Sequence, residues 1–494
     1  MRFAYYQDLM FFNGSAWDRY FTSQSDDRID YDVIVIGSGM GGGILGVATS
    51  DRGLRTLVLE AGPIRHLVNV TDLPVAHTVE SFNPYELAGN TRLDGGVCFN
   101  LGGRSIFWSA VIPRMLDWEL AYWPNEIAEY LTGDGYARAE QLFRKRTEYP
   151  EFQRKLVGRV AEGFPDYSVT HLPRSYHQPD SAINPRPGSP DERTTGVFST
   201  AALLADAVLH GKTENGVGTL HVALEHLVDR IILDGSTAVS VEVLDLRQRQ
   251  RKVFRGKHII MACGATESPR LALTSSVADP CGLVGVGLVD HPEAEIHFDV
   301  PSDSQMISGN DQGNVYLRHN GGDGPPGDHF SCELALNHKF WDVRIEDDTI
   351  WKQEFGHASP AASTIKFLFR NPLNNANNIT VEGDRYRVFL EPMGRPLEAE
   401  ARLLGQRLLR FFGVEPEGHP LRYLPAAVTY HLGGSMRMGE PGSSVVNADL
   451  RFHEYDNLYC CDLSVFPDIP AANPSLTLGA LALRLADDLR ARCT

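Results

Sequence analysis

Positive charge is scarce in this chain of 494 residues. Lys and Arg together number 46 against 63 Asp and Glu, which gives a formal net charge of −17. Without a basic stripe the chain cannot displace counterions from a phosphate backbone, and this excludes nucleic acid as a partner. Acidity of this size serves solubility, and it would also attract a cationic substrate mildly.

Regular cysteine spacing and long apolar runs are also missing. The seven cysteines are scattered without C-x-x-C pairs, so they indicate neither a zinc knuckle nor a disulfide framework and favour a reducing compartment. No run approaches the roughly 18 apolar residues that a membrane span needs. The stretch MRFAYYQDLMFFNGSAWDRYF at the start lacks the basic, apolar and cleavage regions of a signal peptide. We expect a soluble cytoplasmic protein without membrane contact.

Two groups of catalytic motifs are absent. The sequence has no G-x-S-x-G elbow, which argues against a serine hydrolase, and no H-E-x-x-H or carboxylate triad, so we expect no metal. It also lacks internal repeats. With 43% hydrophobic residues it can bury large cores, and its length predicts two domains or one domain with a large insertion.

A glycine-rich turn follows the first apolar run. Residues 33–36 (VIVI) read as a central parallel strand, and Gly37, Gly39 and Gly42 then give the pattern G-x-G-x-x-G. In this pattern the first glycine permits a tight turn, the second lets the backbone approach a pyrophosphate, and the third packs helix on strand. We expect a helix over 41–51 with phosphate at its N-terminus.

Glu60 ends the second expected strand, residues 56–59. A carboxylate at this point can accept both ribose hydroxyls of an adenosine and would repel a 2′-phosphate. Strand, glycine turn, helix, strand and acid in this order indicate a dinucleotide site. NAD and FAD share the ADP half, so this unit alone does not choose between them.

Four later segments add to this unit: NLGGRSIFWSAVIPRM (100–115), HIIMACGATESPRLAL (258–273), VGVGLVDHP (284–292) and the closing segment from Leu458, which contains Asp462, Asn473 and Pro474. Together they resemble the glucose-methanol-choline (GMC) family of flavin oxidoreductases. The five segments follow the order of the family. The resemblance implies an α/β fold (α+β overall), in which a Rossmann-type FAD-binding domain carries an inserted, mainly antiparallel β-sheet substrate domain.

The turn GGRSIFW (102–108) is similar to that of the pyranose oxidase branch, in which a histidine is bonded to the flavin. Phe107 stands at the position of that histidine and has no nucleophile, so we expect non-covalent FAD. The segment TTGVFSTAALL (194–204) also resembles the sugar-oxidising branch. Arg104 and Trp108 can each contact the cofactor or serve packing.

The stretch TYHLGGSMRMG (429–439) contains the expected base. His431 matches the catalytic histidine of the family, and an imidazole, with an unperturbed pKa of about 6.5, accepts a hydroxyl proton near neutral pH while flavin accepts the hydride. Gly433 and Gly434 allow a tight turn at the cofactor. Asn473 matches the second member of the catalytic pair and can donate to a developing alkoxide. His291, in the D-H-P turn, is either structural or in contact with substrate or flavin.

The resemblance also implies the remaining contacts with FAD. Val228 would read the adenine through its backbone, Asp462 would lie near the ribityl chain and pyrophosphate, and the helix that begins at Pro474 would point its N-terminus at the flavin. The full set expected to bind the cofactor is Gly37, Gly39, Gly42, Glu60, Gly102, Gly103, Ser105, Trp108, Val228, Cys263, Gly264, Asp462, Leu463, Asn473, Pro474, Ser475 and Leu476.

These motifs are spread over the chain, so the FAD-binding domain is expected to be discontinuous, over 30–115, 191–299 and 421–494. The substrate-binding domain and connecting segments then take 116–190 and 300–420. The proline-rich stretch 176–196 reads as an irregular crossing between domains, and 316–330 as a hairpin or loop.

The sequence therefore predicts FAD-dependent oxidation of a secondary alcohol of a sugar or glycoside to a keto-sugar. An amino sugar is an alternative substrate because the chain is acidic, and an NAD-dependent dehydrogenase or a non-catalytic flavin-binding protein are alternative classes. The residues leave open which sugar and carbon react, whether O₂ or another acceptor reoxidises the flavin, and whether the chain forms a homo-oligomer.

Overall fold

The structure is a computed structural model of the chain. It describes residues 21–22, 24–67, 69, 84–91, 93, 96–175, 196–210, 219–301, 304, 306–307, 312–319, 329–337, 363–383, 385–424 and 430–493. The stretch 176–195, most of the expected loop within 316–330, and Thr429 lie outside the described residues.

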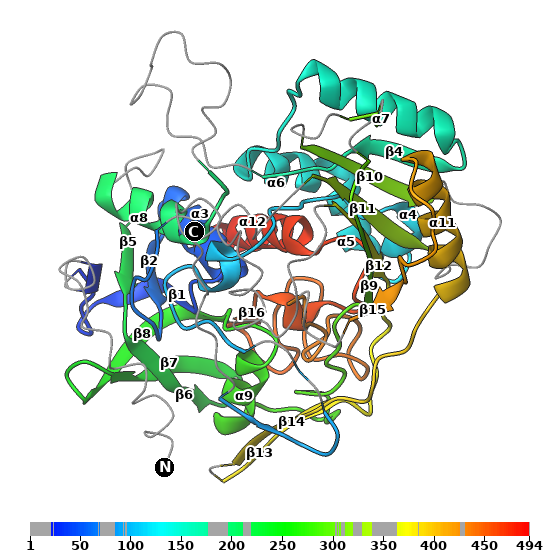
Figure 1. The fold of residues 1–494 in the computed structure, drawn as a ribbon. Helices are drawn as coiled ribbons and strands as arrows, with labels where there is room; N and C mark the ends of the chain where they lie inside the picture. Colours follow the sequence, from blue (N-terminus) through cyan, green and yellow to red (C-terminus); the bar gives the residue numbers. More distant parts are fainter. Residues whose placement is uncertain are drawn as a thin grey trace.

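A seven-stranded sheet forms the first half of the fold (Figure 1). Its order is β5-β2-β1-β8-β7-β6, with β16 added beside β8. The strands are β1 (Asp30–Ile36), β2 (Arg55–Leu59), β5 (Thr219–Ala223), β6 (His226–Asp234), β7 (Thr237–Asp245), β8 (Gln250–Met261) and β16 (Leu458–Cys460). The pairs among β5, β2, β1, β8 and β16 are parallel, and β6, β7 and β8 form an antiparallel meander. The apolar run of β1 is central and buried, as a strand covered on both faces should be.

Helix α3 (Met40–Asp51) packs against this sheet, and α12 (Ser475–Cys493) packs on α3. Helix α8 (Thr200–His210) packs against α3, and helix α6 (Tyr136–Leu142) packs against α12. The short helices α4 (Asp117–Leu120) and α5 (Asn125–Tyr130) contribute to the same hydrophobic core through Leu120 and Ile127. Figure 1 shows α12 between the two halves of the molecule, which places its N-terminus near their boundary.

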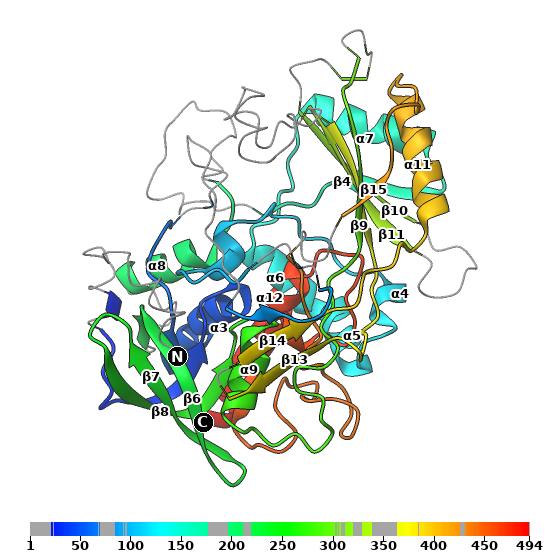
Figure 2. The ribbon, with the colours of Figure 1, turned by 60° about the horizontal axis from the view of Figure 1, so that its bottom comes forward.

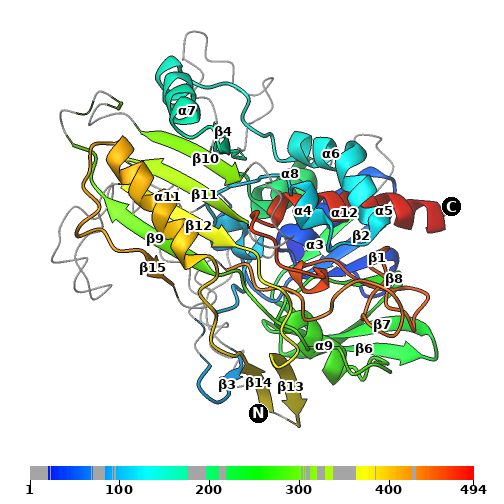
Figure 3. The ribbon, with the colours of Figure 1, turned by 90° about the vertical axis from the view of Figure 1, so that its right-hand side faces the viewer.

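A six-stranded antiparallel sheet forms the second half, with the order β15-β9-β12-β11-β10-β4. Its strands are β4 (Tyr167–His171), β9 (Glu293–Phe298), β10 (Gly313–His319), β11 (Phe330–Leu336), β12 (Ser363–Phe369) and β15 (Arg422–Tyr423). Helices α7 (Glu151–Gly163) and α11 (Glu398–Phe411) cover its apolar face, and Figure 3 shows α11 lying along β9 and β12. The mixed α/β architecture with an antiparallel sheet confirms the predicted fold class.

A small third sheet lies beside the first half, and Figure 2 shows its strands near α9 (Glu267–Thr274). It consists of β13 (Asn378–Glu382), β14 (Arg385–Phe389) and β3 (Glu86–Leu87). Two 3₁₀ segments, η3 (Gly103–Ile106) and η5 (Leu463–Val465), and the π-helical turn η4 (Leu131–Gly135) complete the described elements.

The strands and helices divide differently from the expected domain limits in two places. Strands β9 and β15 pair within the six-stranded sheet although both lie in ranges assigned to the cofactor domain, because the register joins Glu293 to Leu368 and Arg422 to Glu295. Helices α4 to α6 lie in the range 116–190 but pack in the core of the first half. All strands of the seven-stranded sheet fall within the ranges 30–115, 191–299 and 421–494.

All seven cysteines are free thiols. Among the described residues, no helix combines the length and apolar character required to cross a bilayer.

Candidate active site

The glycine turn between β1 and α3 has the geometry that its spacing predicts. Gly37 has φ of +102°, a region that favours glycine, and a Cβ added there would lie 2.4 Å from the carbonyl oxygen of Ala262. A Cβ on Gly42 would lie 2.1 Å from the carbonyl oxygen of Gly37, so this glycine lets helix and strand meet. Gly39 faces open space instead, with nothing within 4 Å of an added Cβ. Of the three, Gly39 has the room that a bound pyrophosphate requires.

The N-terminus of α3 is built to receive an anion. The cap residue Gly39 offers no side-chain hydrogen bond, and no acidic residue occupies the first turn. The leading N–H groups of a helix without a side-chain cap are free to bind phosphate, which the helix dipole also favours.

Glu60 lies at the carboxyl end of β2, directly beside this turn. Its Oε2 accepts hydrogen bonds from the backbone N–H of Ser38 (3.1 Å) and from the Ser38 hydroxyl (2.5 Å), and its Oε1 accepts from the N–H of Gly62 (2.9 Å). Burial raises the pKa of Glu60 to about 7. A carboxylate has further lone pairs beyond these three bonds, so it can still accept from a ribose.

The strand that carries Val228, β6, starts at His226, which is hydrogen bonded to Glu60. The N–H of Glu60 donates to the Ala223 carbonyl (2.9 Å), and the N–H of His226 donates to the Glu60 carbonyl (2.9 Å). Val228 follows in β6, paired with Val243 and buried. The structure thus brings the two residues expected at the adenosine to neighbouring positions.

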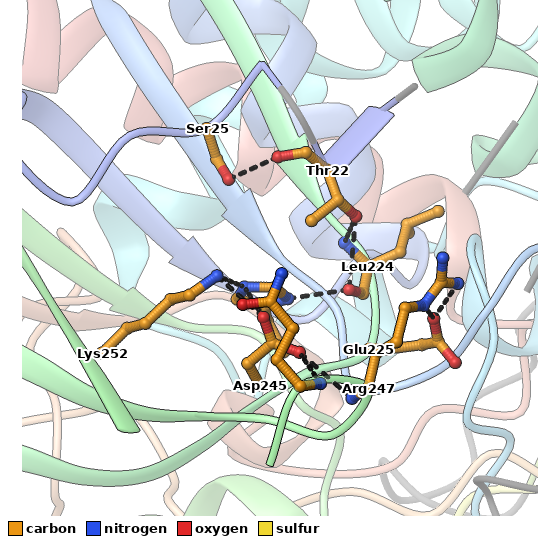
Figure 4. Close-up of polar contacts among 9 residues, drawn as sticks. Thr22, Ser25, Leu224, Glu225, Asp245, Arg247 and Lys252 are labelled. Carbon is orange, nitrogen blue, oxygen red and sulfur yellow. Dashed lines mark hydrogen bonds and ion pairs between the residues drawn. The ribbon is translucent and has the colours of Figure 1, made fainter. Parts of the chain in front are cut away.

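A polar network holds residues 224–226 in place (Figure 4). The guanidinium of Arg247 donates to the Glu225 carboxylate, and the ammonium of Lys252 donates to Asp245 (2.8 Å). Glu225 has φ of +59°, an unfavourable value for a residue with a Cβ, and these bonds help to hold it there.

The segment from Gly102 to Trp108 packs over the glycine turn. Gly102 and Gly103 both have positive φ, and an added Cβ on Gly103 would lie 3.1 Å from the Cα of Gly39. The N–H of Gly102 donates to the Ser38 hydroxyl (2.9 Å), and the Ser105 hydroxyl donates to the Gly102 carbonyl (2.7 Å). Trp108 is half-buried and donates from its indole to the carbonyl of Phe198 (2.8 Å), so its ring is fixed in the core.

Asp462 ties the second motif to the closing segment. One carboxylate oxygen accepts from the N–H of Gly264 (2.9 Å) and the hydroxyl of Ser268 (2.5 Å), and the other accepts from the N–H of Ser464 (2.9 Å). The N–H of Cys263 donates to the same Ser268 hydroxyl (3.0 Å). As placed, this acid organises backbone N–H groups where β8 ends.

The turn after His431 packs on η5. The N–H of Gly434 donates to the Leu463 carbonyl (3.0 Å), and a Cβ on Gly433 would lie 2.7 Å from the same oxygen. Tyr430, directly before His431, has φ of +59°. Its ring meets Phe107 edge-on at 6.1 Å between centroids, and the Arg104 guanidinium lies over it at 4.1 Å. Phe107, which stands where the resemblance places a flavin-linked histidine, therefore packs against Tyr430, the residue before His431.

His431 is hydrogen bonded to a second histidine. Its Nδ1 lies 2.8 Å from Nε2 of His291, and Nδ1 of His291 lies 3.0 Å from the carbonyl oxygen of Pro470. Because a carbonyl only accepts, His291 carries its proton on Nδ1, and in a neutral ring Nε2 is then an acceptor. His431 must donate from Nδ1, which leaves its Nε2 with a free lone pair.

Both rings are neutral at neutral pH. Burial lowers the pKa of His291 to about 4. Burial also lowers the pKa of His431 well below its usual value, and the positive charges of Lys366 and Arg104, with that of His291 once it is protonated, lower it further. Within the part of the chain that the structure describes, Nε2 of His431 has no hydrogen-bond partner. It is therefore available as a base.

Asn473 lies at the end of a buried four-residue segment, 470–473, directly before α12. Pro470 accepts from His291, Ala471 accepts from the Ser331 hydroxyl (2.8 Å), and the N–H of Ala472 donates to Glu119 (2.8 Å). Asn473 is buried, and its Oδ1 has no hydrogen-bond partner. His291 thus links His431 to the segment that carries the second expected catalytic residue.

The start of α12 completes the set of expected residues. Pro474 accepts from the N–H of Leu478 (3.0 Å), Leu476 is fully buried and Ser475 is half-buried. No acidic residue lies in the first turn of this helix, so its dipole is available to stabilise negative charge.

Asp290, His291 and His431 also form a group whose ligand atoms lie within 4.8 Å of one another. Such a set can hold a metal ion, but the facing nitrogens of the two histidines are hydrogen bonded to each other. A metal between them would need a lone pair from both rings and would break this bond. The absence of a metal stays a prediction.

Three connecting residues were not identified from the sequence. Ser38 links Glu60 to Gly102, Thr200 donates to the Ser38 carbonyl (2.9 Å), and Glu119 joins Ala472 to Arg318. Ser38 lies within the G-S-G triplet, where its closeness to the end of β2 was the available signal. For Thr200 and Glu119 the sequence offers no such signal.

Comparisons with known proteins support the family. A GMC oxidoreductase model matches residues 203–293, and a second one matches 419–482. This confirms the expected resemblance at the level of the GMC oxidoreductases.

Similar curated proteins fall into two groups. Oxygen-dependent choline dehydrogenases of Stenotrophomonas maltophilia are 27% and 28% identical over 53% of this chain, which spans only 51% of their length. The same enzyme of Chromohalobacter salexigens is 24% identical over 94% of this chain and 95% of its own. A C-glycoside 3-oxidase of Microbacterium trichothecenolyticum is 22% identical over 79% of this chain and 76% of its own length. They leave the pyranose oxidase branch as a prediction.

The fold is similar to the crystal structure of pyridoxine 4-oxidase from Mesorbium loti. The TM-score is 0.60 at 17% identity, and the match covers 92% of this chain and 98% of that one. The likeness supports the arrangement of the two large sheets.

The glycine turn yields a matched pair of variants. Gly39→Ala should leave the unfolding free energy of the apoprotein within about 0.5 kcal/mol of wild type, because the added methyl group meets open space and the φ of −61° suits alanine. It should nevertheless weaken FAD binding by about tenfold or more. Gly42→Ala should destabilise the apoprotein by about 1–3 kcal/mol, because the methyl group meets the Gly37 backbone.

Urea unfolding and FAD titration measure both quantities. Unchanged FAD affinity in Gly39→Ala would remove the phosphate site from this turn.

Proposed function

We propose that this chain is a FAD-dependent alcohol oxidoreductase of the GMC family, which oxidises a secondary hydroxyl of a sugar or glycoside to a ketone. The observation that carries the proposal is the hydrogen-bonded series from Pro470 through His291 to His431, which leaves one basic nitrogen. The family models and the fold support the class of reaction. The glycoside 3-oxidase among the relatives supports the sugar substrate.

The described residues fit FAD. Gly39 and the uncapped N-terminus of α3 would hold the pyrophosphate, Glu60 the adenosine ribose, and the acid-free first turn of α12 the electron-rich side of the isoalloxazine. When bound, FAD supplies a hydride acceptor for the carbon that is oxidised.

His431 performs the proton transfer. Its Nε2 accepts the hydroxyl proton of the substrate, so that the carbon can release a hydride to the acceptor. The positive charge that forms on the ring is stabilised through Nδ1, which donates to His291, and onward to the Pro470 carbonyl. His291 therefore acts as a positioning residue that fixes the tautomer of the base.

Asn473 stands ready to bind the substrate oxygen. Its amide is buried in the segment that also accepts the bond from His291, so base and amide share one support. An amide neither gains nor loses a proton in the reaction, and it can hydrogen bond the reacting hydroxyl while His431 takes the proton.

Anaerobic flavin bleaching tests the proposal. The purified protein should show the visible flavin band, and a panel of monosaccharides and glycosides should contain a compound that bleaches it. His431→Ala should slow bleaching about 100-fold or more, because a positioned general base contributes roughly that factor. His453→Ala, which removes a half-buried histidine outside this hydrogen-bonded series, should bleach like wild type.

The alternatives give different results. A protein without the flavin band would be the NAD-dependent dehydrogenase, and a yellow protein that no compound bleaches would be the non-catalytic binder. Full bleaching by His431→Ala would end the assignment of the base.

The pH dependence of flavin reduction follows from the pKa of His431. The base acts unprotonated, and burial holds its pKa well below 6.5. As the pH falls through 6.5 the reduction rate should therefore stay constant, and it should decline only at lower pH. Stopped-flow reduction across the range measures this, with the bound FAD determined at each pH because Glu60 has a pKa of about 7. A decline centred on 6.5 would contradict a buried neutral base.

Acid precipitation tests how the flavin is held. Phe107 meets Tyr430 but carries no atom that can bond to the flavin, so all flavin should enter the supernatant. A yellow pellet would show a covalent link and contradict the expected non-covalent FAD.

A further inference from the structure

The two faces of the six-stranded sheet differ in character. The register places Val315, Leu334, Ile365 and Ile296 on the face that α7 and α11 cover. The opposite face carries the row Tyr316, Glu333, Lys366 and Glu295, directly paired across four strands. Since strand residues alternate between faces, all four side chains share one side.

This polar face packs against the segment that carries Asn473. Ser331, two residues before Glu333 and therefore on the same face, donates to the Ala471 carbonyl. The Asn473 amide lies near the Glu333 carboxylate and lowers the pKa of that acid. Glu333 thus lies in contact with one of the two expected catalytic side chains.

Glu333 is buried without full hydrogen bonding. Only 9% of its surface is exposed, and its Oε1 has no hydrogen-bond partner. Asn473, 6% exposed, leaves Oδ1 unpartnered beside it. The hydroxyl of Tyr316, paired across the strands with Glu333, also makes no hydrogen bond of normal geometry. Buried polar atoms without hydrogen-bond partners are rare in folded proteins, and a bound ligand would supply the partners that these atoms lack.

The neighbouring lysine does not compensate Glu333. The ammonium of Lys366 lies 2.9 Å from Glu293 and 3.5 Å from Glu295, so it is engaged on the far side of the row. Burial raises the pKa of Glu333, although the fields of Lys366 and Arg174 and the nearby Asn473 amide act to lower it. The carboxyl group of Glu333 can accept a hydrogen bond whether it is ionised or protonated, and this suits a hydroxyl group as its partner.

We propose that Glu333, together with Asn473, forms a subsite for a second hydroxyl group of the substrate, beside the hydroxyl that His431 deprotonates. The proposal rests on the proposed function and deepens it by naming the substrate class, a vicinal diol of a sugar ring. A quaternary ammonium group has no hydrogen-bonding atom and would leave these oxygens unpartnered. Glu333 is then the residue that selects a polyol over a choline-like alcohol.

Binding without turnover tests the subsite. The holoenzyme of His431→Ala is titrated with glucose, galactose, mannose and xylose, and binding is followed by perturbation of the flavin spectrum and by Tm. The tightest sugar is compared with its monodeoxy analogues. At least one analogue should bind more weakly by a factor of about ten or more, because the missing hydroxyl group leaves a buried oxygen of the protein without a partner.

Substitutions of Glu333 on this background identify the oxygen responsible. In Glu333→Ala the preference for the parent sugar over that analogue should fall to within about twofold. Glu333→Gln should give an intermediate preference, since an amide keeps part of the hydrogen bonding, and it preserves the shape if the alanine variant does not fold. The exposed Glu126→Gln is the matched control and should keep the full preference.

Three results would overturn the subsite. One is an unchanged preference in Glu333→Gln and Glu333→Ala, another is equal binding of every deoxy analogue, and the third is binding of choline in place of all four sugars. A different result would contradict the proposed function: the binding preferences hold, but no sugar bleaches the flavin of the wild-type protein.

Discussion

The site depends on how the backbone polar groups of residues 470–473 are satisfied. Buried carbonyl and N–H groups need partners, and here each partner comes from a different part of the chain. His291 bonds Pro470, Ser331 bonds Ala471, and Glu119 bonds the N–H of Ala472. The same three bonds join His291, which is hydrogen bonded to His431, the antiparallel sheet and the helices near α12 to this segment. The two halves of the molecule therefore meet at the segment that carries Asn473, and this one backbone segment supports both Asn473 and, through His291, His431.

Local patterns predicted the cofactor half of the fold well. The glycine spacing, the apolar run of β1 and the acid after β2 all act through neighbours in sequence, and β1, α3 and β2 begin within a residue or a few of the expected points. The antiparallel character of the second sheet came from the family resemblance. The domain limits near 293 and 422 were missed because they depend on the strand pairing of β9 and β15, which is a long-range property.

The candidate site was only half visible in the sequence. His431 and Asn473 could be found from their motifs, but the motif does not show that His291 fixes the tautomer of His431. That bond joins residues 140 positions apart. Glu333 did have a local signal, since β11 alternates polar Ser331 and Glu333 with apolar neighbours. Alternation says which residues share a face, but not which segment that face meets; here it meets residues 470–473, because Ser331 donates to the Ala471 carbonyl.

On the polar face of the six-stranded sheet, charge and hydrogen bonding would favour different ligands. Glu293, Glu295 and Glu333 outnumber Lys366 on one sheet face, which would attract a cation. Burial raises the pKa of Glu293 to about 8, however, so at neutral pH this acid is largely protonated and the excess of negative charge is small. What remains is a set of unpartnered oxygens, whose burial costs free energy until a ligand bonds them. A ligand that carries hydroxyl groups can recover that free energy by hydrogen bonding, whereas a quaternary ammonium group cannot, and the proposed preference for a sugar rests on this difference.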